Sequence, residues 1–294
     1  GATPFATCSK RLQDYRFDTV IFDEASQITV PLAVMAMRAA KKFIFIGDQK
    51  QLPPVMLSKS VLAKDSFSVF ARLIQKKCDA VMLDETYRMN RWLTQWPSQT
   101  YYDDQLQAAG DNRERQLSLL HALPSRFAAV FDPKVSGIFI PTKAINTRTR
   151  NEEEARLVTN LCDAVHQAGL PLKEIGIVSP FRAQGKAIRT LLGERFGQRQ
   201  AQAVVADTVE RMQGQERELV ILSMATGDPV FLSAIGEFFF QPERLNVSIT
   251  RAKTKLIVCG PEPERIPVSE HEHVNQWIGQ YRSFIKQLHR VDLP

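Results

Sequence analysis

The chain has 294 residues with a formal net charge of +6, and it is 44% hydrophobic and 24% charged. That balance excludes a disordered or low-complexity protein, and the length predicts about two globular domains. The small positive charge favours a polyanionic partner, although a solvated basic surface explains it as well.

Short apolar runs at residues 19–22 and 42–46 are typical of buried strands, and each ends in polar or glycine residues. The apolar residues between positions 28 and 41 predict a connecting helix. Alternating strands and helices favour an α/β fold with mostly parallel sheets, in which ligands bind at the carboxyl ends of the strands. We expect a first domain over residues 1–77.

The second half repeats this alternation and predicts a second domain over residues 78–268. Its clearest helix spans 151–168, with Asn151 as N-cap and Glu154 completing a capping box. The stretch 103–136 has little periodicity and predicts a surface excursion. Four apolar runs predict the strands of a second parallel sheet, at 175–178, 203–205, 219–222 and 256–258.

The C-terminal segment, 269–294, has apolar residues at helical spacing from 274 to 288. This pattern predicts an amphipathic helix that packs on the second domain. No apolar run reaches the about 18 residues of a membrane span, so no membrane partner is expected. The four cysteines show no C-x-x-C spacing, which predicts reduced thiols in an intracellular, cytoplasmic or nuclear compartment rather than a zinc site.

The first candidate site follows the strand at 19–22, where the chain continues directly into Asp23 and Glu24. A carboxylate at a strand end suits a magnesium ion held through water, and a second acid can orient an attacking water. A turn or a helix cap is the plain alternative for such a pair. The next strand leads into Gly47, and Gln51 in that loop offers an amide that can sense a terminal phosphate.

The 294 residues contain no G-x-x-x-x-G-K-[ST] phosphate loop. They also begin at Gly1-Ala2-Thr3 without an initiator methionine. We therefore expect the chain to be the C-terminal part of a longer protein, whose upstream part carries the phosphate loop.

Five motifs follow one another: D-E-A-S-Q, G-D-x-x-Q-L-P-P, Y-R-M, T-V-x-x-x-Q-G-x-E and R-x-N-V-x-x-T-R-A-K. In this order they resemble motifs II to VI of superfamily 1 helicases, in the Upf-like branch that moves 5′ to 3′. The resemblance covers residues 3 to about 260. It implies tandem RecA-like domains of the P-loop NTPase type, the first one truncated, that use ATP and Mg²⁺ to move on single-stranded DNA or RNA.

The resemblance also implies roles for individual residues. Asp23 would hold magnesium through water, Glu24 would polarise the attacking water, and Gln51 would contact the terminal phosphate. Arg88 and Arg251 would be arginine fingers. The nucleotide would be bound by a further set of residues: Gln213, Gly214, Glu216 and, through base stacking, Tyr87.

Several of these residues also have simpler explanations. Arg88 can pair with Asp84 or Glu85, and Tyr87 can be a core residue. Glu216 can pair with Arg217 or Arg211.

Candidates for strand contact are Thr3, Pro180, Phe181, Arg182 and Thr208. Small hydroxyls bind phosphates without reading sequence, and an aromatic ring such as Phe181 can stack on a base. Core packing is an equal alternative for Phe181.

Two other functions remain open at this stage. One is a non-catalytic nucleic-acid-binding module, although binding alone requires none of the predicted catalytic residues. The other is a structural or regulatory partner whose site is completed by the phosphate loop of another chain. The isolated chain is expected to have little ATPase activity.

Overall fold

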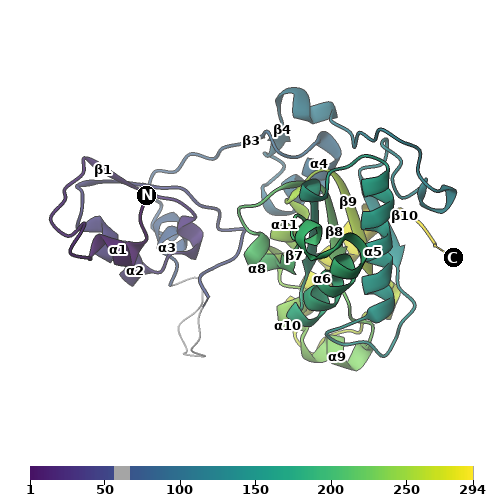
Figure 1. Ribbon diagram of the computed structural model, residues 1–294. Coiled ribbons are helices and arrows are strands. Elements are labelled where there is room, and N and C mark those ends of the chain that lie inside the picture. Colours follow the sequence, from purple (N-terminus) through teal and green to yellow (C-terminus); the bar gives the residue numbers. More distant parts are fainter. Residues whose placement is uncertain (56–66, 294) are drawn as a thin grey trace. The chain divides into compact units, whose positions relative to one another are not determined.

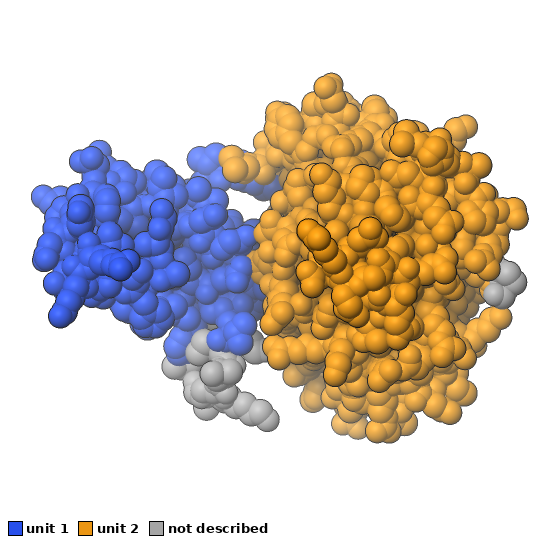
Figure 2. Space-filling model, viewed as in Figure 1, with its two compact units in different colours: residues 1–82 blue, residues 83–294 orange. Residues whose placement is uncertain are grey.

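The computed structural model describes residues 1–55 and 67–293. The chain divides into two compact units, Gly1–Met82 and Leu83–Pro294, here called unit 1 and unit 2 (Figure 2). The division between residues 82 and 83 lies a few residues C-terminal to the expected boundary between residues 77 and 78. Each unit is described separately below.

Unit 1 contains two parallel strands, β1 (Thr19–Phe22) and β2 (Lys42–Phe45). Alternation along the strands turns Phe22 and Phe45 to the same face, where their rings stack with centroids 4.5 Å apart. In the described part of unit 1 the helices α1 (Pro4–Thr7), α2 (Val30–Met37) and α3 (Val69–Gln75) accompany the strands. The core of unit 1 joins Phe22 to small residues of α2 and to Val69 at the start of α3.

The opposite face of this sheet is exposed among the described residues. Ile21 and Ile44 are register partners on that face, and they are 61% and 49% exposed. The strands of unit 1 therefore bury one face and leave an apolar face open.

Unit 2 is built on a six-stranded sheet with the order β10-β5-β9-β8-β6-β7, in which every neighbouring pair is parallel. The strands are β5 (Gly137–Pro141), β6 (Ile175–Ser179), β7 (Val205–Thr208), β8 (Arg217–Ser223), β9 (Ala252–Gly260) and β10 (His289–Arg290). A separate parallel pair joins β3 (Glu85–Thr86) to β4 (Gln107–Ala108). The expected fold class, α/β with mostly parallel sheets, is confirmed.

Helices cover both faces of the large sheet. On one face lie α5 (Glu152–Gln167) and α6 (Arg182–Phe196), in front of the strands in Figure 1. On the other face Trp96 of α4 (Arg91–Tyr101) packs against Phe284 of α12 (Glu272–Gln287), with ring centroids 4.9 Å apart. The shorter helices are α7 (Gln198–Ala201), α8 (Val209–Met212), α9 (Pro229–Ala234), α10 (Gly236–Phe239) and α11 (Pro242–Ile249).

The predicted C-terminal amphipathic helix is present as α12. Its apolar stripe is buried within unit 2, including Val274, Ile278 and Phe284. No helix among the described residues combines the length and the apolar character that crossing a membrane requires.

Two expectations were wrong. The stretch 103–136 is not only a surface excursion, because Leu117, Phe127 and Phe131 belong to the main core of unit 2. The capping box is also incomplete. Asn151 accepts a hydrogen bond from the Glu154 N–H as predicted, but the Asn151 N–H donates to Gln184 Oε1 (2.8 Å) instead of to Glu154.

Candidate functional site

The acidic pair of unit 1 lies at the carboxyl end of β1. Glu24 has a left-handed backbone (φ 49°), which turns the chain sharply after the strand. Its N–H donates to Asp23 Oδ1 (3.0 Å), and its own carboxylate accepts from Gln27 Nε2 (3.3 Å). Asp23 is exposed, so its carboxylate is accessible to a hydrated cation.

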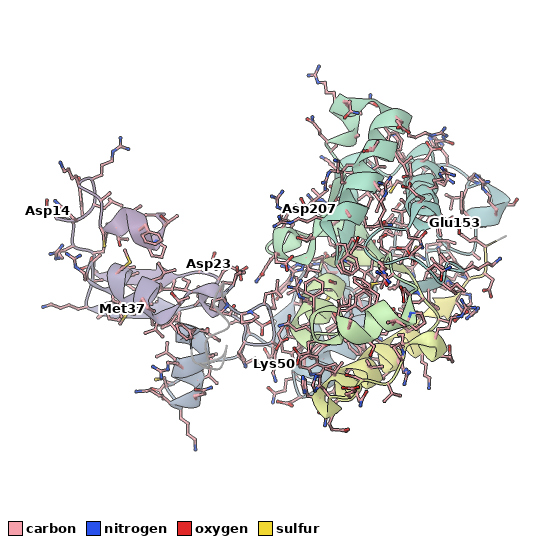
Figure 3. All side chains as sticks on the ribbon, turned by 90° about the horizontal axis from the view of Figure 1, so that it is seen from below. Asp14, Asp23, Met37, Lys50, Glu153 and Asp207 are labelled. Atoms are coloured by element: carbon pink, nitrogen blue, oxygen red, sulfur yellow. The ribbon has the colours of Figure 1, made fainter. Side chains whose placement is uncertain are left out.

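The loop after β2 lies against this turn. The Ala25 N–H donates to the Ile46 carbonyl (2.8 Å), and a Cβ on Gly47 would lie only 2.9 Å from the Ser26 nitrogen. The absence of a side chain at position 47 therefore lets the two loops meet, as predicted for one edge of a parallel sheet. Asp23 and Lys50 lie toward the end of unit 1 opposite Asp14 (Figure 3).

Gln51 is oriented inside this second loop. Its Nε2 donates to Asp48 Oδ2 (2.9 Å), and the other oxygen of Asp48 accepts from the Lys50 N–H (2.8 Å). Asp48 thus holds the loop and the Gln51 amide in one conformation.

The donor set at Asp23 fits a magnesium ion held mainly through water. Among the described residues no cluster of three or more His, Cys, Asp or Glu side chains could enclose a metal by itself. Mg²⁺ commonly uses one or two carboxylates, with waters and substrate phosphates as its other ligands. An exposed Asp23 matches that mode better than a closed cage.

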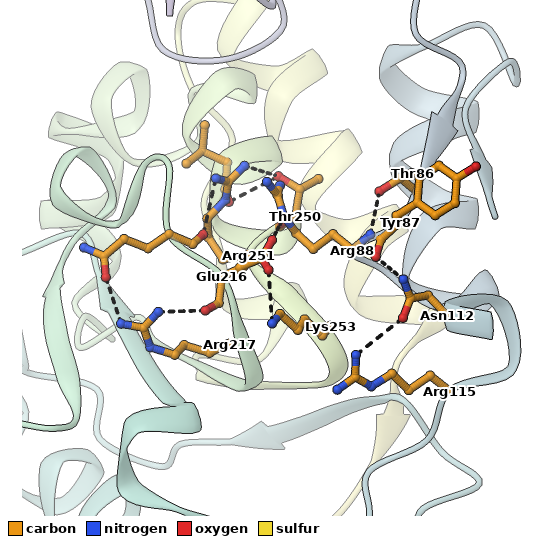
Figure 4. Close-up of polar contacts among 12 residues, drawn as sticks. Thr86, Tyr87, Arg88, Asn112, Arg115, Glu216, Arg217, Thr250, Arg251 and Lys253 are labelled. Atoms are coloured by element: carbon orange, nitrogen blue, oxygen red, sulfur yellow. Dashed lines mark hydrogen bonds and ion pairs between the residues drawn. The ribbon is translucent and has the colours of Figure 1, made fainter. Parts of the chain in front are cut away.

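In unit 2, Arg88 lies between a carboxylate and a backbone carbonyl. Its Nε is 2.8 Å from Glu216 Oε2, and its Nη1 donates to the Thr250 carbonyl (3.1 Å) (Figure 4). Neither Asp84 nor Glu85, the alternatives suggested by the sequence, is its partner in these contacts. The Arg88 side chain is 31% exposed, so its guanidinium is held but remains accessible.

Glu216 also binds a second cation. Lys253 Nζ lies 3.0 Å from its Oε1, so one carboxylate receives Arg88 on one oxygen and Lys253 on the other. Burial tends to raise the pKa of Glu216, but its bonds to these two cations outweigh that effect and lower the pKa. Glu216 is therefore ionised at neutral pH. Its carboxylate pairs with Arg88 and Lys253, whereas Arg217, one of the alternatives suggested by the sequence, bonds to its backbone carbonyl.

Arg251 is more deeply placed, with only 2% of its surface exposed. Its Nε donates to the Val247 carbonyl (3.0 Å), and one of its terminal nitrogens donates to Thr250 Oγ1 (3.0 Å). A weaker contact reaches the Gln215 carbonyl (3.4 Å). Arg251 therefore links the end of α11 to the loop that carries Glu216.

That loop turns at Gly214, whose φ of +75° lies in the left-handed region that favours glycine. Gln213, which precedes it, closes the short helix α8. This turn brings Glu216 to the start of β8 beside β9, where Lys253 lies. The Gln213-Gly214-x-Glu216 spacing thus has a direct structural reason.

Tyr87 is not a core residue, because it is 65% exposed. Its hydroxyl donates to Glu85 Oε2 (3.0 Å), and this hydrogen bond together with the negative charge of Glu85 raises the pKa of Tyr87. A Cβ on Gly110 would lie 3.3 Å from the ring, so Gly110 supports one edge of it. An exposed, supported ring is suited to stacking on a planar ligand.

Two residues of this region, Asn90 and Lys253, were not among the predicted site residues. Asn90 is buried, with 4% of its surface exposed. Its Nδ2 donates a hydrogen bond to Ser136 Oγ (2.9 Å), and its backbone N–H donates to the Lys253 carbonyl (3.1 Å). It thereby fixes the Tyr87–Asn90 segment to the start of β9. Lys253 is the last residue of the R-x-N-V-x-x-T-R-A-K motif. Its place in that motif, two residues after Arg251, is the feature of the sequence that could have identified it as a site residue.

The predicted strand-contact residues are divided between the units. Thr3 caps α1 in unit 1 through its hydroxyl. In unit 2, Pro180, Phe181 and Arg182 follow the carboxyl end of β6, and Thr208 ends the neighbouring strand β7. The strand predicted at 203–205 is Val205–Thr208, so Thr208 lies at the strand end itself. Phe181 is half-buried, and its ring contacts three other rings.

Comparison with known families gives two matches, each described as an AAA domain, over residues 2–59 and 66–262. Human DNA replication ATP-dependent helicase/nuclease DNA2 is 32% identical over 270 residues, which cover 84% of this chain and 25% of that protein. The DNA polymerase alpha-associated DNA helicase A of Schizosaccharomyces pombe is 31% identical over 288 residues, covering 92% of this chain and 41% of that protein.

Helicase SEN1 of Saccharomyces cerevisiae is 31% identical over 259 residues, which cover 83% of this chain and 11% of that protein. The chain thus spans well under half the length of these curated relatives. Among solved structures, the PRRSV helicase aligns with a TM-score of 0.43 at 15% identity, over 83% of this chain and 35% of that one. From the family matches, the chain belongs to the AAA-domain proteins of the Upf-like branch of superfamily 1 helicases.

Proposed function

We propose that this chain is the C-terminal motor region of an ATP-dependent DNA or RNA helicase or translocase. ATP hydrolysis between its two RecA-like domains drives 5′-to-3′ movement on a single strand. ATP and Mg²⁺ are the cofactors, and single-stranded DNA or RNA is the macromolecular partner. The three relatives described above are named as helicases, and human DNA2 is named as an ATP-dependent one, which supports the general activity.

The observation that carries the proposal is the charged cluster of unit 2. Glu216 binds Arg88 and Lys253, and Arg251 is anchored on the adjoining turn. Packing alone does not require Arg88, Arg251 and Lys253 at these positions, because apolar residues could fill the same space. A planar guanidinium held on a carboxylate can transfer to phosphate oxygens, which accept the same fork of hydrogen bonds.

The individual roles follow from this chemistry. Asp23 holds magnesium through water, Glu24 polarises the attacking water, and Gln51 contacts the terminal phosphate. Magnesium, when bound, neutralises charge on the phosphates. The left-handed backbone of Glu24 and the hydrogen bond from its N–H to Asp23 Oδ1, which hold the two acids together at the end of β1, support this assignment.

Arg88 and Arg251 act as arginine fingers in this proposal. Glu216, with Gln213 and Gly214, lines the nucleotide site, and Tyr87 stacks on the base. The exposure of Tyr87 and the accessible guanidinium of Arg88 support these two assignments. Arg251 has to leave part of its carbonyl cage to reach a phosphate, so we expect its contribution to depend on domain movement.

Strand contacts are proposed for Thr3, Pro180, Phe181, Arg182 and Thr208. In unit 2 these residues gather at the carboxyl ends of β6 and β7, which are neighbours in the sheet. Hydroxyls and backbone N–H groups there can hold phosphates independently of base sequence.

The test uses the full-length protein that contains this chain. We expect Mg²⁺-dependent ATP hydrolysis that single-stranded oligonucleotides stimulate, and unwinding of duplexes with a 5′ overhang but not a 3′ overhang. Strand binding without any nucleotide hydrolysis, and with no effect of a non-hydrolysable ATP analogue on affinity, would instead identify a non-catalytic binding module.

A second assay concerns residues 1–294 alone. They contain no phosphate loop, so we propose that an upstream part of the same protein supplies it, and that the isolated chain releases little phosphate. Turnover by the isolated chain equal to that of the full-length protein would contradict this part of the proposal. Sizing chromatography distinguishes it from completion by a second, separate chain.

A further inference from the structure

A cluster of phenylalanine rings lies beside the predicted strand contacts of unit 2. Phe181 is at its centre, with ring centroids 6.0 Å from Phe231 of α9 and 6.1 Å from both Phe238 and Phe239 of α10. Phe239 is 6% exposed and forms the base of the cluster, whereas Phe238 is 38% exposed. Phe181 and Phe231 are half-buried, so three rings of the cluster reach the surface.

Arginine side chains accompany these rings. The Arg148 guanidinium lies 5.8 Å from the Phe231 ring centre, and the Arg244 guanidinium lies 4.2 Å from that of Phe238. Arg182, next to Phe181 in the chain, is exposed at the start of α6. The 15-residue helix α6 has no acidic residue in its first turn and no side-chain N-cap, so its first N–H groups add to the positive potential.

The acidic groups nearby are already engaged. Asp228 pairs with Arg148 (2.9 Å) and also accepts the N–H groups of Val230 and Phe231, which lowers its pKa. Glu237 contacts His273 Nε2 (3.1 Å) on the adjacent helix. Arg244 is likewise paired with Glu210, so the positive charge that remains beside the rings comes from Arg182 and the first turn of α6.

We infer that Phe231 and Phe238 form, together with Phe181, a base-stacking platform for single-stranded nucleic acid. It extends the strand-binding surface beyond Pro180, Phe181 and Arg182 onto α9 and α10. Rings that reach the surface, interleaved with guanidinium groups, suit bases and phosphates at once and require no base-specific hydrogen bonds. The inference rests on the proposed function, because it assumes that the protein binds single strands.

Exposure and orientation argue against a purely structural cluster. A satellite core would bury its rings, as it buries Phe239, but Phe238 is 38% exposed and Val230, which precedes Phe231, is 76% exposed. Arg182 follows Phe181 in the chain, the Phe181 ring contacts the Phe231 ring, and Arg148 lies over Phe231. A strand that runs from Arg182 to Arg148 therefore passes both rings.

The experiment measures binding of the full-length protein to two labelled oligonucleotides of equal length, one normal and one with abasic sites throughout. Phe231→Leu and Phe238→Leu retain apolar bulk but remove the ring, and Val230→Ala is the matched control on the same surface. We expect each leucine variant to lose about tenfold or more in affinity for the normal oligonucleotide. Affinity for the abasic oligonucleotide should change little, and Phe238→Trp should restore binding to the normal one.

The outcomes separate the two proposals. If the unmodified protein binds neither oligonucleotide, the proposed function itself fails. If it binds the normal strand and both leucine variants bind equally well, the platform is overturned while the proposed function stands. Equal losses on normal and abasic strands would also overturn it, because they would indicate a lost fold or lost phosphate contacts rather than lost stacking.

Discussion

Arg88 and Glu216 are 128 positions apart in the chain, yet Arg88 Nε lies 2.8 Å from Glu216 Oε2. Both side chains are partly exposed, at 31% and 42%. An ion pair with that exposure contributes little to stability, because solvent screens it. Its value lies in orientation, since it holds the guanidinium of Arg88 at a known place before any phosphate arrives.

Replacing Arg88 by lysine should therefore reduce catalysis far more than it reduces stability. Lysine keeps the charge but loses the planar fork that binds a transferring phosphoryl group. We expect the ATPase kcat of the full-length protein to fall by ~10³-fold, within the range known for arginine fingers. The melting temperature should change by no more than a few degrees.

Arg91 provides the matched control for this substitution. It stands three residues further along, is 61% exposed and pairs with Glu114 on the surface of α4. Arg91→Lys should leave hydrolysis unchanged. Equal effects of the two substitutions would show that position 88 has no special role.

The acidic pair of unit 1 should separate into two functions on substitution. Glu24→Gln should retain binding of ATP and Mg²⁺ but abolish turnover, because an amide cannot polarise the attacking water. Asp23→Asn should instead raise the Mg²⁺ concentration needed for half-maximal activity. Asp14→Asn, in a distant exposed part of unit 1, serves as the control, and a Mg²⁺ titration of ATP hydrolysis distinguishes the three variants.

The parts of this structure that depend on local pattern were predictable from the sequence. The apolar run at Thr19–Phe22 predicts β1, and the residues after it predict an acidic turn at the sheet edge. Close contact between this turn and the Gly47 loop also follows, because parallel strands end at a common edge. The spacing of apolar residues in α12 likewise predicts its buried stripe.

Partners across the chain were not predictable in the same way. Local candidates for Arg88 were Asp84 and Glu85. The Asn90 N–H instead bonds to the Lys253 carbonyl in β9, and β9 pairs with β8, at whose start Glu216 lies within reach of Arg88. Phe127 and Phe131 show no periodicity because they enter the core from turns and a short 3₁₀ helix rather than from one long element. Such contacts depend on tertiary arrangement, which residue spacing alone does not specify.

Glu154 should make the stability of unit 2 depend on pH. It is 1% exposed, and burial raises its pKa to about 7 although Ser223 Oγ (2.6 Å) and the Ala225 N–H (2.8 Å) bond to its Oε1 and oppose the rise. Because the folded pKa lies above the ordinary value of 4.5, the folded state favours the protonated acid. The stabilisation is complete below pH 4.5 and is lost as the pH rises to about 7.

Glu154→Gln removes this titration while retaining a side chain of the same shape. Between pH 4.5 and 7, the unfolding free energy of the unmodified protein should fall relative to that of the variant by up to about 3 kcal/mol. Urea unfolding of both proteins across this pH range measures the difference. A constant difference would mean that Glu154 titrates normally in the fold.

Gly47→Ala tests whether the close approach of the two loops in unit 1 is needed. The added Cβ would lie 2.9 Å from the Ser26 nitrogen and 3.2 Å from that of Ala25, and backbone atoms cannot move away as a flexible side chain can. We expect unit 1 to lose about 1–3 kcal/mol of stability, as in other overpacked sites. ATP hydrolysis should fall as well, because the loop that carries Gln51 is pushed away from Glu24.

Gly279→Ala is the control, since it makes the same change where the structure has room. Gly279 lies exposed within α12, and a Cβ there meets nothing within 4 Å. Alanine should stabilise that helix by about 0.5–1 kcal/mol through its better helix propensity. Opposite signs for the two substitutions in chemical unfolding, with ATPase activity reduced only by Gly47→Ala, are the expected result. Full activity of Gly47→Ala would show that the contact between the loops is dispensable for hydrolysis.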